Sequence, residues 1–71
     1  MELDEYLWRN KIRQWKFAQK LGIMPHSLSR IVQKKVTPKL YVAVKIVEAT
    51  EGQVSYRELL RPEDEKLMNE G

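Results

Sequence analysis

The stretch QWKFAQKLGIMPHSLSRIVQ, residues 14–33, decides the fold of this chain. Each half of it carries apolar residues at the spacing of one buried helix face: Phe17, Ala18 and Leu21 in the first half, and Leu28, Ile31 and Val32 in the second. Gly22 stands where the first helix must stop, because glycine adopts a positive φ without steric cost. Pro25 suits the first position of a helix, where its fixed φ is already correct. The stretch therefore predicts two short helices, over 14–21 and 25–33, joined by a tight turn.

The second of these helices has a polar outer face. If Leu28 and Ile31 point into the core, the opposite side presents five residues without an acid among them: Pro25, His26, Ser29, Arg30 and Gln33. A helix that enters the major groove of DNA needs such long or polar side chains free of carboxylates. We therefore predict that these five contact bases, and that Arg30 donates to O6 and N7 of a guanine. The alternative for Arg30 is a phosphate contact or a surface ion pair.

The spacing of Ala18, Gly22, Leu28 and Ile31 resembles the helix-turn-helix signature of the phage Cro and repressor proteins, the Xre-like family. The likeness extends to both sides of the motif and covers most of the 71 residues. It implies an all-α fold, a compact bundle of about five short helices of the lambda-repressor-like type with a central helix-turn-helix. It also implies a homodimer on a palindromic DNA site, with recognition helices about 34 Å apart. We expect residues 54–60 and the C-terminal tail to supply the dimer contact.

Positive charge is concentrated on the same part of the chain. No Asp or Glu occurs between Glu5 and Glu48, whereas this interval carries ten lysines and arginines. A field of one sign attracts a polyanion; the alternative is an ordinary solvated basic surface. The resemblance adds a phosphate contact at the start of the helix over 14–21, where unpaired N–H groups bind anions. We predict phosphate contacts for eight residues: Arg13, Gln14, Lys16, Lys20, Ser27, Lys34, Lys35 and Lys39.

Three positions depart from the family pattern. Met24 stands where Ser or Thr usually caps the recognition helix, and this loss should cost about 1 kcal/mol. Pro25 occupies a position that often carries a polar base-reading residue, which shifts base contacts toward His26, Ser29 and Arg30. The residues after this helix, 33–35, contain no glycine, so either one of them adopts a left-handed conformation at some cost or the helix extends slightly.

The flanking sequence predicts further helices. An N-terminal helix over 1–10 would bury Leu3, Tyr6 and Leu7, and a helix over 39–50 would follow a cap at Thr37–Pro38. Its apolar face is predicted to comprise Leu40, Ala43, Ile46 and Val47. Ser55 and Glu58 have the spacing of a capping box for a fifth helix, which Pro62 ends. We predict a DNA-binding domain over 1–61 and an acidic, flexible tail over 62–71, and we expect Trp15 to be packed into the core.

Composition restricts the functional classes. The chain has one histidine and no cysteine, and its carboxylates lie near the two ends, so we expect neither an enzyme, nor a metal site, nor a cofactor. No apolar run approaches the roughly 20 residues of a membrane span, and we expect a cytoplasmic protein without a membrane partner.

The predicted function is sequence-specific binding of double-stranded DNA by a small transcriptional regulator. It would be a Cro-like repressor, either of phage origin or the antitoxin that pairs with a toxin. The alternative is a protein-interaction module of the same fold that binds an acidic protein partner. Such a module should carry aromatic anchors on the outer face of the helix over 25–33, and that face has none.

Overall fold

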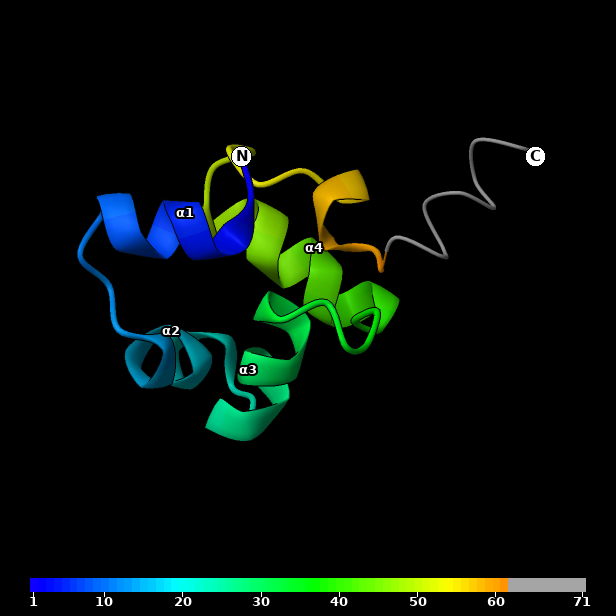
Figure 1. Cartoon of the computed structure of the whole chain (residues 1–71), viewed down its shortest axis with the longest axis horizontal. Coiled ribbons are helices and arrows are strands. Elements are labelled where there is room, and N and C mark those ends of the chain that lie inside the picture. The colour runs from blue at the N-terminus through cyan, green and yellow to red at the C-terminus, as the bar shows by residue number, and fades with distance from the viewer. Residues whose placement is uncertain (62–71) are drawn as a thin grey trace.

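The computed structural model of the chain describes residues 1–61, which form an all-helical domain with no strand among them (Figure 1). Its elements are α1 (Leu3–Arg9), α2 (Gln14–Leu21), α3 (Pro25–Val32), α4 (Leu40–Ala49) and the 3-10 turn η1 (Arg57–Leu59). The all-α prediction is confirmed. The predicted fifth helix is no more than the single turn η1, because Leu60 directly after it is already extended. The acidic tail predicted over 62–71 lies outside the described residues.

The two helices predicted from residues 14–33 are present with nearly the predicted bounds. α2 contacts both α3 and α4, and Figure 1 shows α1 lying above α2 and α4 above α3. Gly22 ends α2 in the left-handed conformation, with φ of 76°. The turn closes when the N–H of Ile23 donates to the carbonyl of Ala18 across 3.0 Å. Met24 precedes α3 without a side-chain cap, as expected.

Replacing Gly22 by alanine should lower the free energy of unfolding by about 1 kcal/mol, because an L-residue is strained at this φ. A Cβ at this position would meet nothing within 4 Å, so the loss would come from the backbone alone. Urea unfolding measures it, with the exposed Lys20→Ala in the preceding turn as the control. Equal stability of Gly22→Ala and the wild type would contradict the left-handed cap.

The core is a single cluster drawn from all four α-helices and from the segment that follows them. It comprises Leu3, Tyr6, Leu7, Phe17, Ala18, Leu21, Leu28, Ile31, Val42, Ala43, Ile46, Val54 and Leu59. The rings of Tyr6 and Phe17 are tilted against each other with centroids 6.3 Å apart, which joins α1 to α2. Thr50 is a fully buried polar residue; its hydroxyl donates to the Val47 carbonyl and accepts the N–H of Val54. The hydrogen bonds of this hydroxyl therefore fix the chain as it leaves α4.

Two predictions about α4 are wrong. Thr37 does not cap the helix, which begins at Leu40 after Lys39. The Thr37 hydroxyl instead accepts the N–H of Arg61 across 3.2 Å. Leu40 is 66% exposed, and Val42 occupies the core position that we assigned to it. The reason is angular: Val42, unlike Leu40, lies on the same side of the helix as the buried Ala43 and Ile46.

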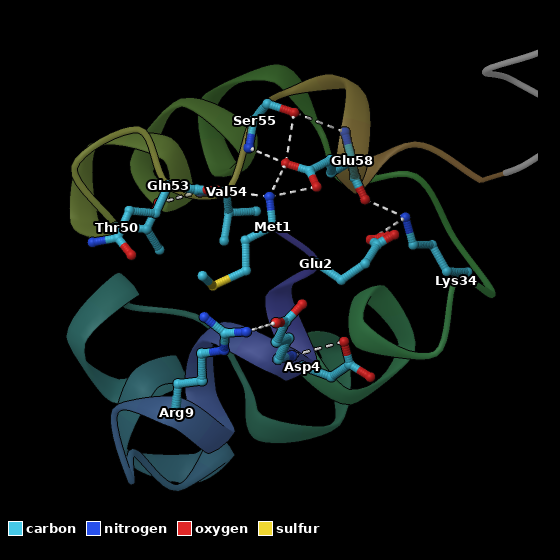
Figure 2. Close-up of polar contacts among 11 residues, drawn as sticks. Met1, Glu2, Asp4, Arg9, Lys34, Thr50, Gln53, Val54, Ser55 and Glu58 are labelled. Carbon is cyan, nitrogen blue, oxygen red and sulfur yellow. Dashed lines mark hydrogen bonds and ion pairs between the residues drawn. The ribbon is translucent and has the colours of Figure 1, made fainter.

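The chain after α4 returns to the N-terminus through a polar network (Figure 2). Ser55 and Glu58 form the predicted capping box, in which the Ser55 N–H donates to Glu58 Oε1 at 3.0 Å and the Glu58 N–H donates to Ser55 Oγ at 3.3 Å. The same carboxylate oxygen accepts the N-terminal ammonium of Met1 at 2.6 Å. That ammonium also donates to the carbonyl of Gln53 at 3.0 Å. One carboxylate thus connects the first residue to the turn before η1.

Replacing Glu58 by glutamine should flatten the acid side of the stability curve. The N-terminal ammonium, and then the Ser55 N–H, hold the pKa of the Glu58 carboxyl below its usual value. A lowered pKa stabilises the fold fully above the ordinary value of about 4.3, and this stabilisation is lost as the pH falls through the lowered pKa. We expect Glu58→Gln to cost about 1 kcal/mol at pH 7 and progressively less at lower pH.

Chemical unfolding between pH 2 and pH 7 measures this difference. Glu48→Gln, which changes an exposed carboxylate on α4, is the matched control. A constant gap between Glu58→Gln and the wild type at every pH would mean that the charge of Glu58 contributes nothing.

Candidate nucleic-acid interface

The outer face of α3 is polar and open to solvent. His26, Arg30 and Gln33 are exposed and Ser29 is half-buried, on the side opposite the buried Leu28 and Ile31. Gln33 follows the last residue of α3, and its side-chain amide donates to the Ser29 hydroxyl across 2.9 Å. This face therefore presents imidazole, guanidinium, amide and hydroxyl groups along one side of a short helix. These are the groups that hydrogen-bond to base edges.

The start of α2 is the second component of this surface. Arg13 is the residue before the helix and Gln14 is its first residue, and both are exposed. No side chain caps the first turn of α2 or of α3, and neither first turn contains an acid. Helix N-termini carry a partial positive charge and unpaired N–H groups. Both helices therefore begin in a state suited to an anion.

A hollow of about 370 Å³ lies between α3 and the segment that leads into α4. It brings together three of the predicted contact residues, Ser27, Arg30 and Lys39, with Tyr41 beside them. Lys35, which follows α3, is exposed. Arg30 thus belongs both to the outer face of α3 and to a basic hollow on its flank.

Lys20 does not line the hollow that contains Ser27, Arg30 and Lys39. It lines a separate hollow of about 490 Å³ with Lys45, Glu48 and Glu51 beside the end of α4. Lys16 is exposed on α2. The basic surface therefore extends around α2, but near Lys20 it meets Glu48 of α4 and Glu51, which follows α4.

Lys34 is engaged inside the domain (Figure 2). Its ammonium donates to the carbonyls of Glu58 and Leu60 and lies 3.1 Å from the carboxylate of Glu2. Lys34 is also the residue that adopts the left-handed conformation required after α3, with φ of 62°. Its partners lie far away in sequence, so no local pattern indicated this role. We leave Lys34 out of the candidate interface.

The prediction that Trp15 is packed in the core is wrong, because 53% of this residue is exposed. Trp8 is 80% exposed and Met24 61% exposed. Trp15 is the second residue of α2 and Met24 directly precedes α3. The basic surface therefore contains large apolar side chains that sequence reasoning did not place there, because the buried face of α2 is complete without Trp15.

No protein-family model matches the chain, and no curated protein or solved structure matches it. The candidate interface therefore rests on its own geometry. Within residues 1–61, no three His, Cys, Asp or Glu side chains gather in a way that would hold a metal ion. None of the helices in this range combines the length and apolar character needed to cross a bilayer.

Proposed function

We propose that this protein binds double-stranded DNA in a sequence-specific manner and acts as a small transcriptional regulator, with α3 in the major groove. The observation that carries the proposal is the outer face of α3, where His26, Arg30 and Gln33 are exposed along a helix whose sequence contains no acid. A helix about 10–12 Å across with such a face fits a groove about 12 Å wide.

Charge and helix termini support the same orientation. The start of α2 is uncapped, and Arg13 directly precedes it. Lys35 and Lys39 follow α3 in the chain, and all three cations are exposed. Phosphate contacts of this kind fix the register of a protein on the duplex, and base contacts then read the sequence. We interpret α2, the turn after it and α3 as a helix-turn-helix, in a lambda-repressor-like arrangement of the Xre-like kind.

A homodimer on a palindromic operator is part of this proposal. The stretch 54–60, which we expected to form the dimer contact, uses Val54, Leu59 and Leu60 in the interior of the protomer. Within this stretch, Tyr56 is a large side chain that keeps 38% of its surface exposed. A contact through this stretch would therefore rely on Tyr56 and on polar groups.

A titration of the ¹⁵N-labelled full chain with mixed-sequence duplex DNA at low salt tests the proposal. We expect amide shifts at residues 13–16 and 24–39 that fade as salt is added, because released counterions drive the contact. Polyglutamate is the matched control, since it is an anion without a groove. Shifts that are absent at low salt, or the same with polyglutamate, would contradict the proposal.

Replacing Lys35 by alanine should weaken binding to all duplexes by a similar factor. Lys35 is exposed directly after α3, where a lysine contributes one phosphate contact and no base reading. We expect the slope of log affinity against log salt concentration to fall by about one. Fluorescence anisotropy at several salt concentrations, on two unrelated duplexes, measures this slope. A loss confined to one duplex would contradict the phosphate role.

One observation favours the second candidate, a module that binds an acidic protein partner. Trp8, Trp15 and Met24 are exposed, and aromatic side chains among cations are typical anchors of protein interfaces. The polyglutamate titration tests this second function. Shifts at Trp8, Trp15 and their neighbours with polyglutamate, without shifts along α3 when DNA is added, would favour the acidic protein partner.

A further inference from the structure

An apolar hollow of about 300 Å³ adjoins the start of α3. It is lined by Trp15 and Gln19 of α2, Ile23 of the turn, and Pro25, the first residue of α3. Apart from the amide of Gln19 the lining is hydrocarbon and aromatic ring. Ile23 is half-buried, whereas Trp15 keeps 53% of its surface exposed. A large aromatic ring left open beside a hollow suits a binding surface better than a core.

The position of the hollow determines what can reach it. It extends from the second residue of α2, across the turn, to the first residue of α3. His26 and the rest of the outer face of α3 begin directly after Pro25. If α3 lies in the major groove, as the proposed function states, the hollow faces the bases and sugars next to those that His26 meets.

The chemistry of the hollow restricts its ligand. Pro25 has no N–H, and neither Trp15 nor Ile23 offers a charge. Gln19 supplies an amide and Trp15 an indole N–H, but most of the lining is the apolar surface of Trp15, Ile23 and Pro25. That surface matches a methyl group better than the polar edge of guanine or adenine. Thymine is the standard base that presents a methyl group in the major groove, and apolar side chains read it by contact.

The surroundings favour a nucleic acid over an apolar protein segment. The helix start at Gln14 is uncapped, and the exposed Arg13 and Lys16 stand within two residues of Trp15 in the chain. Cations therefore adjoin Trp15 in sequence, while the hollow itself is mostly apolar. A duplex combines an anionic backbone with methyl groups recessed in the groove, and its charge complements these cations.

We propose that this hollow receives the 5-methyl group of a thymine, and that Trp15 is a specificity-determining residue of the interface. The inference rests on the proposed function. It assigns thymine recognition to α2 and the turn, in addition to the base contacts of α3.

Deletion of single methyl groups tests the inference. The full chain first selects its preferred duplex from a randomised library, and each thymine of that duplex is then replaced in turn by deoxyuridine. At the thymine that enters the hollow, we expect the wild-type Kd to rise about fourfold, the usual effect of one buried methyl group. At thymines outside the hollow we expect no such change. Fluorescence anisotropy measures each Kd.

Two variants connect the effect to the hollow. For Trp15→Ala, the ratio of the Kd for deoxyuridine to that for thymine should fall to about one at that position. Trp8→Ala is the matched control, because Trp8 is exposed but lines a different hollow with Leu7 and Ile12. It should leave the ratio unchanged. Amide spectra of both variants verify that they are folded.

The outcomes separate this inference from the proposed function. A wild-type Kd that no deoxyuridine substitution changes, on a duplex that still needs Arg30, would overturn the methyl site alone. A weaker but equally thymine-selective Trp15→Ala would also overturn it, because the ring would then rest on the sugar-phosphate backbone. If no duplex is enriched and none binds at low salt, the proposed function fails, and the methyl site fails with it.

Discussion

Phe17→Ala should lower the free energy of unfolding by about 3–5 kcal/mol, the usual loss for a buried phenylalanine. Phe17 is 1% exposed and its ring lies against Tyr6, so truncation removes apolar contact and also an aromatic pair. A single core in a domain of this size rarely supplies more than about 3–5 kcal/mol of net stability. We therefore expect a large part of the population to be unfolded at moderate temperature.

Thermal and urea unfolding followed by far-ultraviolet circular dichroism would measure this loss. Lys16→Ala is the matched control, because it truncates the exposed neighbour of Phe17 on the same helix. It should change stability by no more than about 0.5 kcal/mol. Equal effects of the two substitutions would mean that α2 does not pack on α1 through Phe17.

Arg30→Ala should weaken binding to the preferred duplex by about 1–3 kcal/mol, which is about 5- to 150-fold, and remove the preference at one base pair. Arg30 is exposed on the outer face of α3. Its planar guanidinium can donate two parallel hydrogen bonds to O6 and N7 of one guanine. The measurement is the Kd for the preferred duplex and for its single-base variants, at one fixed salt concentration.

Arg30→Lys is the control that separates charge from base reading. Lysine keeps the positive charge but cannot form the planar two-bond contact. We expect this variant to keep most of its affinity for unrelated duplexes while losing the base preference. If Arg30→Ala bound every duplex more weakly by one common factor, Arg30 would be a phosphate contact and the assignment of the groove-facing side of α3 would be wrong.

The sequence predicted the junction of α2 and α3 closely because local chemistry fixes the end of α2 and the start of α3. Gly22 is the residue that adopts the positive φ, and Pro25 is the first residue of α3. The apolar face of each helix is separated from its polar face by clear spacing. Where a residue such as Gly22 or Pro25 marks the end or the start of a helix, that boundary can be predicted without knowledge of the tertiary structure.

The face of α4 could not be read in the same way. Most residues of α4 are apolar, so the spacing does not distinguish a buried side from an exposed one. Tertiary packing made the choice, and it buried Val42 and left Leu40 in solvent. Thr37 shows the same limit, because the partner of its hydroxyl, the N–H of Arg61, lies 24 positions away.

The candidate interface was predictable only in part. The exposed side chains of α3 follow from the burial of Leu28 and Ile31, and the structure places them on one face. The exposure of Trp15 and the internal role of Lys34 were not predictable, because both depend on where other segments lie. A tryptophan is usually largely buried and a lysine usually exposed, which is the reverse of the exposed Trp15 and the partly buried Lys34.

The contacts of Lys34 restrict the conformational freedom of α3 in the free protein. Lys34 is the second residue after α3. Its ammonium contacts the carboxylate of Glu2, before α1, and the carbonyl of Leu60, after η1. The C-terminal end of α3 is thereby anchored to both ends of the described chain. Ordering a loose segment upon association consumes interaction energy, whereas a preorganised one avoids this entropic cost. If the domain binds DNA as proposed, α3 should therefore already have its bound orientation in the free protein.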